Sequence, residues 1–460
     1  MEWTRSEKIS LSPQTYDVVV VGGGTAGSAA AIASALSGAK TLIVERGASL
    51  GGSASGGQVT PMMCNRIEGN IDGSSINKLL KARMAREGHS LDDGYGNDGW
   101  FNPEMLKFTL EEMVAEAGGS LLYDTALIDS TVEDNRVEAI LVHGRSGLER
   151  IRAKTFVDCT GDAELACLSG VTCTSGNTKG ENQSVSLRFM VANVDLDRLQ
   201  AFLKHLGESC ILELPLLEMA CEWTGTTPLS EIFRKAVADG LLEFEDTVYF
   251  QGFAVPGMPG VISFNCPEIP AHRDTLDSRQ MSEALVIGRR MIKRLFNFLC
   301  CRVEGFEQSF ILSVADRLGV RESRRISGSY VLSEKDFQLR RKFSDGIAKT
   351  SYSIDIHGEM EEKAFDLCPM KPGEYTEIPF RCLWAGEVEN LLVGGRCLSA
   401  TFIAQSAARI QPTCRETGEA AGIGAALCAL KGIKVSELDG RLVRAEMEKR
   451  LTKAVSGNNA

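Results

Sequence analysis

The sequence predicts an α/β fold with two domains, in which a parallel sheet and a β-meander form one domain and an inserted α+β unit forms the other. Three observations predict it. A strand, a glycine-rich turn, a helix and a second strand follow one another between residues 16 and 45. Short apolar runs alternate with turn residues between 120 and 157. The strand–glycine–helix pattern then returns between residues 389 and 431.

The N-terminal segment predicts a compact βαβ unit. Residues 16–21, YDVVVV, are apolar and β-branched, which is typical of a strand covered on both faces. An alanine-rich helix is expected from Ser28 to Ser37, with Gly38 ending it. The second strand is expected at Thr41–Val44, so the connection between the two parallel strands is a right-handed crossover.

The next segment predicts a helix followed by a β-meander. Residues 102–118 begin with Asn102, a good N-cap, and Pro103 at the first helical position. From 120 to 157 the apolar runs and turn residues are those of successive antiparallel strands. The meander is expected to return to a central strand at Thr155–Asp158.

The region from 172 to 375 has a different pattern and is predicted to be the inserted domain. Residues 16–171 and 376–452 then form the discontinuous first domain, with tails at 1–15 and 453–460. The expected strands and helices of the insertion are Val185–Val191, Thr247–Phe253, Val261–Asn265, Asp197–Leu206 and Ser278–Asn297.

Composition excludes several classes of function. Lys and Arg number 50 against 61 Asp and Glu, and this net charge of −11 argues against a nucleic-acid partner. No apolar run is long enough to span a membrane, and the first fifteen residues show no secretory signal. The 14 cysteines are scattered without C-x-x-C, which indicates reduced thiols in a cytoplasmic protein and no iron–sulfur or other metal site.

The glycine-rich turn predicts a dinucleotide site. Gly22, Gly24 and Gly27 fit G-x-G-x-x-G between a strand and a helix. These glycines allow a tight turn, close approach of backbone to a pyrophosphate, and close packing of helix on strand. Glu45 ends the next strand, where a carboxylate accepts hydrogen bonds from a ribose diol. NAD and FAD enzymes share this pattern, so the turn alone does not identify the cofactor.

Two later segments decide between the cofactors. FVDCTGD at 156–162 ends a strand in a turn that carries a carboxylate, and NLLVGGR at 390–396 precedes a helix expected from Cys414 to Leu430. With ERGASLGG, VRESRRISGSYVLSEKD and SYSIDIHGE, the chain resembles the FAD-dependent oxidoreductase family within the glutathione-reductase and fumarate-reductase class of flavoproteins. The resemblance implies a Rossmann-like FAD-binding domain and an inserted substrate domain, with the isoalloxazine between them.

The resemblance also implies which residues bind FAD. The N-terminal turn and the ribose carboxylate supply the adenosine half, and the helix beginning near 411 directs its N-terminus at the flavin. Gly418, Ala421 and Gly422 are expected to let that helix pack closely. The implied contacts are Gly22, Gly24, Thr25, Ala26, Gly27, Glu45, Arg46, Gly51, Gly52, Ser53, Thr160, Gly161, Asp162, Gly395, Arg396, Gln411, Pro412 and Thr413.

His357 and Asp355 are the first candidates for catalysis. In YSIDIH the two residues alternate, so on a strand they share one face, and a carboxylate beside an imidazole suits acid–base chemistry. The alternative is a structural pair.

Arg321, in a cluster with Arg324 and Arg325, is a candidate for binding a substrate carboxylate. The alternative is an ion-paired face with Glu322 and Glu334. Arg381 and Arg409 are further candidates because each precedes a segment expected near the flavin.

The expected reaction is hydride transfer between flavin N5 and a small organic substrate, as in a dehydrogenase or reductase. A second nucleotide-binding fingerprint and a redox disulfide motif are both absent from the sequence. Two alternatives stay open: an oxidase that returns electrons to O2, and an electron-transfer subunit that docks to a partner protein. The substrate, the direction of the reaction and the oligomeric state do not follow from the sequence.

Overall fold

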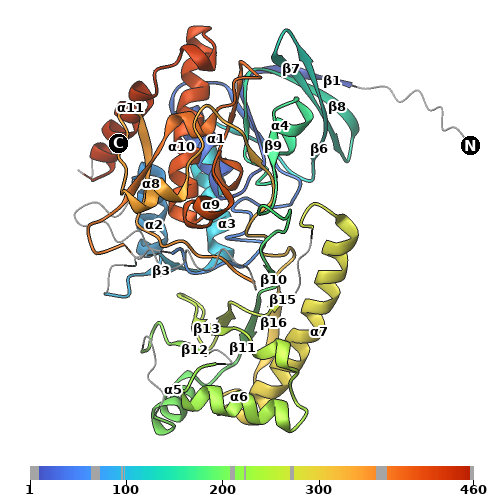
Figure 1. Cartoon of the computed structure of the whole chain (residues 1–460), viewed down its shortest axis with the longest axis vertical. Helices are drawn as coiled ribbons and strands as arrows, with labels where there is room; N and C mark the ends of the chain where they lie inside the picture. Colours follow the sequence, from blue (N-terminus) through green and yellow to red (C-terminus); the bar gives the residue numbers. More distant parts are fainter. Residues whose placement is uncertain are drawn as a thin grey trace, which may run out of the picture.

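The structure is a computed structural model that describes residues 10–63, 73–94, 97, 99–207, 213–221, 224–269, 274–358 and 370–455. Figure 1 shows two units: an upper one with a large sheet and most of the helices, and a lower one with a smaller sheet beside the long helix α7 (Ser278–Arg302). The chain enters the lower unit after the meander and returns to the upper unit for its last third.

The upper unit is built on a seven-stranded sheet with the order β5-β2-β1-β8-β7-β6, in which β20 also pairs with β8. The parallel strands are β5 (Ser120–Leu122), β2 (Thr41–Val44), β1 (Ser10–Val21), β8 (Gly147–Asp158) and β20 (Leu391–Val393). The meander is formed by β6 (Ala126–Glu133), β7 (Arg136–Gly144) and the first half of β8. The predicted parallel sheet with a β-meander is therefore confirmed.

Local signals in the sequence placed the first helices well. α1 runs from Thr25 to Leu36, three residues earlier than expected, and connects β1 to β2. α3 runs from Pro103 to Glu116, and the Asn102 side chain accepts hydrogen bonds from the backbone N–H groups of Glu104 and Met105. The predicted N-cap is confirmed.

Helix α10 (Gln411–Lys431) packs across α1 in the core of the upper unit (Figure 1). A Cβ atom at Gly418 would lie 2.1 Å from the carbonyl oxygen of Ala26, and one at Gly422 would lie 2.2 Å from that of Ala30. Because backbone meets backbone at both positions, the two helices approach this closely only with glycine there.

The lower unit contains a five-stranded sheet with the order β12-β13-β14-β11-β16. Its strands are β12 (Glu218–Cys221), β13 (Phe250–Ala254), β14 (Ile262–Phe264), β11 (Phe189–Ala192) and β16 (Phe310–Val314). Helices α5 (Leu196–His205), α6 (Pro228–Ala238) and α7 bury their apolar side chains against one face, in a hydrophobic core that spans Val185 to Ala315. Elements of both expected types form where the sequence indicated them.

The remaining elements are short or peripheral. They are β3 (Ser90–Leu91), β4 (Trp100–Phe101), β9 (Cys173–Thr174), β10 (Val185–Ser186), β15 (Glu268–Ile269), β17 (Arg325–Ile326), β18 (Gly346–Thr350), β19 (Thr376–Pro379), α2 (Ser75–Arg86), α4 (Glu164–Leu168), α8 (Glu334–Gln338), α9 (Phe402–Ala408) and α11 (Gly440–Val455), with 3₁₀ turns at Phe244–Thr247, Phe380–Leu383, Gly395–Cys397 and Val435–Glu437.

Packing refines the expected domain limits. Leu332, Phe337 and Ile354 belong to the hydrophobic core that contains α1 and α10, and β18 pairs with β19. The last part of the predicted insertion, 172–375, therefore packs on the upper unit, and the division into domains stays a prediction. The last residues of the expected tail at 1–15 lie in β1, where Ser10, Leu11 and Thr15 pair with β8.

The sequence predicts neither a membrane-spanning helix nor a metal site. Among the described residues, no helix is both long and apolar enough to cross a membrane. The eleven cysteines in this part of the chain are all free, and no group of His, Cys, Asp and Glu there is arranged to hold a metal ion.

Candidate functional site

A cavity of about 1780 Å³ separates the two units and continues into the upper one. One end lies at the glycine-rich turn and Glu45, and the walls include Arg396, Gln411 and residues of the lower sheet such as Gln251. The cavity therefore joins the N-terminal βαβ unit to the start of α10 and to the lower unit.

The three glycines of the turn have different surroundings. Gly22 has φ +94°, and a Cβ there would lie 2.5 Å from the carbonyl oxygen of Cys159. A Cβ at Gly27 would lie 1.8 Å from the carbonyl oxygen of Gly22, so this glycine allows the helix to pack on the strand. A Cβ at Gly24 meets nothing within 4 Å, because Gly24 borders the open cavity.

Two helices begin at this cavity without a side-chain cap. α1 starts after Gly24 and α10 after Ile410, and neither N-cap residue accepts a hydrogen bond through its side chain. Free N–H groups and the helix dipole make each N-terminus a donor site for anionic or carbonyl oxygens. Within α10, the fully buried Oγ1 of Thr413 has no partner among the described residues.

Glu45 is held rigidly at the end of β2. Its Oε2 accepts a hydrogen bond from the backbone N–H of Gly23 at 2.6 Å, and its Oε1 accepts one from Gly47 at 2.7 Å. Arg317, in the chain that leaves the lower unit, approaches Oε1 at 3.5 Å. Each carboxylate oxygen has a second lone pair, so Glu45 retains acceptor capacity toward the cavity.

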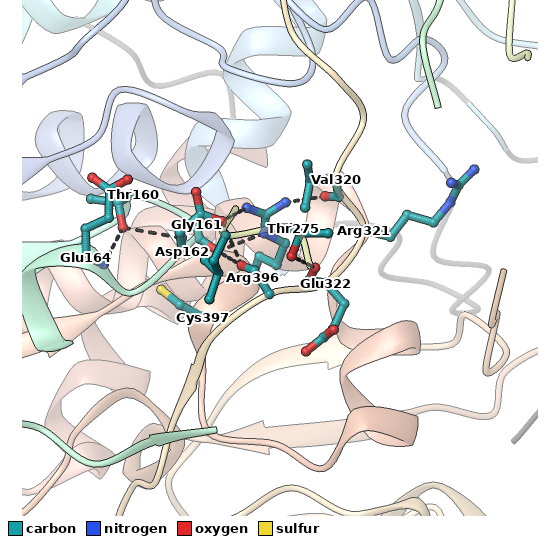
Figure 2. Close-up of polar contacts among 12 residues, drawn as sticks. Thr160, Gly161, Asp162, Glu164, Thr275, Val320, Arg321, Glu322, Arg396 and Cys397 are labelled. Carbon is teal, nitrogen blue, oxygen red and sulfur yellow. Dashed lines mark hydrogen bonds and ion pairs between the residues drawn. The ribbon is translucent and has the colours of Figure 1, made fainter. Parts of the chain in front are cut away.

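A second cluster joins three distant segments, and Figure 2 shows it around Arg396. The Arg396 side chain donates to the carbonyl oxygens of Gly161 and Val320 and pairs with Asp162 at 2.5 Å. Ser323 Oγ also donates to Asp162, at 2.7 Å. The TGD turn and the end of β20 therefore contact each other at the cavity wall.

The sequence candidates His357 and Asp355 face the cavity in a charged cluster. His357 Nδ1 lies 2.8 Å from Glu268, and Nε2 lies 3.3 Å from Asp355. Arg409 pairs with Asp355 at 3.2 Å, and Arg321 approaches Glu268 at 3.7 Å. The segment 351–357 is not assigned to a strand, yet the two predicted partners are in contact.

The electrostatics of this cluster favour ionised carboxylates. Burial raises the pKa of Glu268, but the hydrogen bond from His357 and the charge of Arg321 outweigh it and lower the pKa to about 2. Burial opposes ionisation of Asp355 as well, and His357 and Arg409 hold its pKa below the usual range. Burial raises the pKa of Tyr249, whose ring packs edge-on against His357, to about 12. Both carboxylates are therefore negative at neutral pH.

The other candidates lie in separate places. Figure 2 shows the Arg321 side chain pointing away from Arg396, and Arg321 lines the cavity. Arg325 instead pairs with Glu322 inside the protein, as the ion-paired alternative expected. Arg381 does not line the cavity: it pairs with Asp345 at 2.9 Å and its side chain is 48% exposed, because Phe380–Leu383 forms a 3₁₀ turn away from the cavity.

A comparison with known families decides the classification. The family model described as FAD dependent oxidoreductase matches residues 17–447. The chain belongs to the FAD-dependent oxidoreductase family. It is thus an enzyme of a flavoprotein family, with FAD as its cofactor, as the sequence predicted.

Individual relatives of this flavoenzyme are distant and match in part. Digeranylgeranylglycerophospholipid reductase of Thermoplasma volcanium is 26% identical over 195 residues, which cover 40% of this chain and 48% of the relative. Protein FixC of Escherichia coli is 27% identical over 161 residues, 32% of this chain and 37% of FixC. Thiamine thiazole synthase of Methanococcus aeolicus is 30% identical over 162 residues, 33% and 57% of the two chains. The chain therefore spans between 37% and 57% of the length of these curated relatives.

Solved structures resemble the flavoenzyme along most of its length. A geranylgeranyl bacteriochlorophyll reductase-like protein of Thermoplasma acidophilum shares 14% identity with a TM-score of 0.47, covering 96% of this chain and 84% of the other. The p-nitrophenol 4-monooxygenase PnpA of Pseudomonas putida shares 10% identity with a TM-score of 0.49, covering 98% and 89%. These values describe a distant likeness of fold.

Structural features of the cavity itself fit FAD, independently of the comparison with known families. The open space at Gly24, the uncapped starts of α1 and α10, and the fixed carboxylate of Glu45 supply donors and acceptors along one continuous cavity. When bound, FAD supplies the redox chemistry.

Most residues implied to contact FAD border the cavity. Those that line it are Gly22, Gly24, Thr25, Ala26, Glu45, Arg46, Gly52, Ser53, Thr160, Gly161, Asp162, Gly395, Arg396 and Gln411. Gly27, Gly51, Pro412 and Thr413 do not line it. Arg46 lines the cavity while it pairs with Glu164 at 3.3 Å, and its side chain is 57% exposed. The individual contacts stay predictions.

Sequence reasoning missed several residues of this site. Glu268, Tyr249 and Arg317 carry no local signal, because only tertiary packing brings Glu268 and Tyr249 against His357 and Arg317 against Glu45. Arg188 did carry one: it is a lone charge inside the apolar run SVSLRFMVANV, and a charge in a buried strand usually has a function or a partner.

Proposed function

We propose that this flavoenzyme transfers a hydride between flavin N5 and a small organic substrate held in the cavity between the two units. The observation that carries the proposal is the position of His357, which lies between Glu268 and Asp355 and faces the same cavity as the FAD-binding segments. Hydride transfer to or from carbon requires a proton at the neighbouring atom, and His357 is placed to handle it.

The contacts of His357 favour the role of proton donor. A carboxylate only accepts hydrogen bonds, so Glu268 and Asp355 are placed to accept from the two ring nitrogens of His357 when the ring carries both protons. In reduction of the substrate, the Nε2 proton would leave its 3.3 Å contact with Asp355 and pass to the substrate that receives the hydride, while Nδ1 keeps its contact with Glu268. Arg409 and Arg321 hold the two carboxylates in place and thereby orient the ring.

Reduction of the bound flavin under anaerobic conditions tests the proposal. The FAD-loaded protein is mixed with a panel of alcohols, amines, acids and enones in a stopped-flow spectrometer, and the flavin absorbance is followed. For the reductive direction, flavin reduced with dithionite is mixed with the same panel and its reoxidation is followed. We expect His357→Ala to keep FAD but to slow the substrate-dependent step by two orders of magnitude or more.

His205→Ala, on the surface of α5, is the matched control and should react at the wild-type rate. Equal rates for wild type and His357→Ala would remove His357 from the reaction. The same experiment in air separates the alternatives: rapid release of H2O2 favours an oxidase, and reoxidation only by a second protein favours an electron-transfer subunit. Localisation of the protein in the cytoplasm stays a prediction.

A further inference from the structure

Arg188 differs from Arg321 and Arg409, two other guanidinium groups in the cavity wall. Arg321 and Arg409 each lie within 4 Å of a carboxylate, at 3.7 Å from Glu268 and at 3.2 Å from Asp355. Arg188 is 6% exposed, and its hydrogen bonds go to the carbonyl oxygens of Thr60 at 2.8 Å and of Gln58 at 3.4 Å and to Asn265 Oδ1. All of these acceptors are neutral.

In the described part of the chain, no carboxylate pairs with Arg188, and its Nε has no hydrogen-bond partner. Burial lowers the pKa of Arg188 to about 10, so the guanidinium stays protonated at neutral pH. A buried and uncompensated charge is costly, and proteins keep such a charge where a ligand compensates it.

The polar face of the lower sheet holds Arg188 in position. Asn265, which accepts from Arg188, donates to Tyr249 Oη at 3.0 Å and to Gln251 Oε1 at 2.8 Å. Gln251 in turn donates to Glu218 at 2.6 Å. All five side chains except Tyr249 line the cavity, so this face is a rigid polar wall opposite the FAD-binding unit.

Resting on the proposed function, we infer that the substrate is a small organic acid whose carboxylate is bound by Arg188. One uncompensated charge matches a monoanion better than a dianionic phosphate, and a guanidinium pairs strongly with a planar carboxylate. The chain segment that carries Thr60 belongs to the FAD-binding unit, and Arg188 belongs to the lower unit. A carboxylate at Arg188 would therefore lie where the two units meet.

Binding without turnover tests this inference. The FAD-loaded protein is titrated with acetate, benzoate and succinate, and in parallel with acetamide, benzamide and succinamide, while the flavin absorbance and the melting temperature are recorded. We expect at least one acid to perturb the flavin spectrum and raise the melting temperature at millimolar concentration, and its amide to do neither. Arg188→Leu should weaken that binding roughly 10- to 100-fold, as expected for loss of a charge-assisted hydrogen bond.

Two further variants sharpen the test. Arg198→Leu, on the surface of α5 in the same unit, is the matched control and should bind the acids like the wild type. Asn265→Asp places a carboxylate beside Arg188 and changes the shape of the side chain very little. This carboxylate would neutralise the guanidinium, so the variant should weaken acid binding by a similar factor. It keeps the inference testable if Arg188→Leu fails to fold.

Each outcome decides the inference. Acids that bind no better than amides, or that bind Arg188→Leu as well as the wild type, would overturn it. A lowered flavin midpoint potential in Arg188→Leu with unchanged acid binding would also overturn it, because the charge would then serve the reduced flavin. Acid binding that depends on Arg188, without any flavin reduction or substrate-dependent reoxidation by the whole panel, would sink the proposed function and leave the carboxylate site standing.

Discussion

Arg396 and Asp162, 234 residues apart in the chain, form an ion pair of 2.5 Å at the wall of the cavity. Arg396 Nε also donates to the carbonyl oxygen of Gly161 at 2.8 Å. The two segments that the sequence singled out as separate FAD contacts are therefore one structural unit. The contact fixes the end of β8 relative to the end of β20.

Replacing Arg396 should loosen this unit and weaken FAD binding. Arg396→Gln loses a charge-assisted pair and leaves Asp162 poorly compensated, so we expect a loss of about 1–3 kcal/mol in unfolding free energy. Urea unfolding and flavin retention on gel filtration measure the two effects. In the double variant Arg396→Gln/Asp162→Asn, we expect the loss of unfolding free energy to be little larger than in Arg396→Gln alone. Fully additive losses would show that the two residues act independently.

Gly24→Ala should separate cofactor binding from folding. The new methyl group meets no protein atom within 4 Å and enters the cavity, so the unfolding free energy of the apoprotein should change by less than about 1 kcal/mol. FAD affinity should fall at least tenfold, because the methyl group blocks the approach of the pyrophosphate to the backbone. Titration of apoprotein with FAD, followed by flavin fluorescence, measures it. Unchanged affinity would mean that the pyrophosphate does not approach Gly24.

Gly418→Ala should have the opposite profile and destabilise the fold. Its Cβ would lie 2.1 Å from the Ala26 carbonyl oxygen, so α1 and α10 would have to move apart. We expect a loss of about 3 kcal/mol or more, measured by urea unfolding. Gly386→Ala is the matched control, because a Cβ there meets nothing within 4 Å and its backbone is not left-handed. Equal stability of the two variants would contradict the close packing of the helices.

Glu268 should make stability depend on pH in the acid range. Its pKa in the folded protein, about 2, is below the ordinary value of 4.5, so its contribution is present above pH 4.5 and is lost as the pH falls toward 2. Glu268→Gln should therefore be less stable than the wild type at pH 7, by at most about 3 kcal/mol. The difference should shrink between pH 4.5 and 2 in urea titrations. A constant difference would show that Glu268 is not ionised in the native state.

Patterns of neighbouring residues in the sequence predicted much of the FAD-binding unit. The glycine turn, the Asn102 cap and the strand at 41–44 depend on neighbouring residues, so the pattern placed them correctly. The helix predicted at Ser278–Asn297 also begins where expected, and in the structure the Asp277 side chain accepts hydrogen bonds from the backbone N–H groups of Arg279 and Gln280. The helix caps form because their hydrogen bonds are satisfied within a few residues, whereas the strand at 41–44 is predicted from its apolar residues and pairs with the distant strands β1 and β5.

The site depends on contacts that no local pattern reports. His357 and Asp355 were singled out together, yet their second partners, Glu268 and Arg409, lie far away in the chain and reach them only by tertiary packing. Arg381 looked equivalent to Arg409 in the sequence, but Asp345 draws its side chain away from the cavity. The direction of a side chain at the end of a segment is set by the partner it finds, and that partner is not visible in the sequence.

The order of the elements along the chain has a consequence for synthesis. The lower core is built from one continuous stretch, Val185 to Ala315, and can form soon after that stretch leaves the ribosome. The upper core combines α1 with α10, so its helix layer waits until residue 431 has been made. We therefore expect the nascent chain to carry a folded lower unit beside an open nucleotide site, and to acquire FAD only as its last helices are completed.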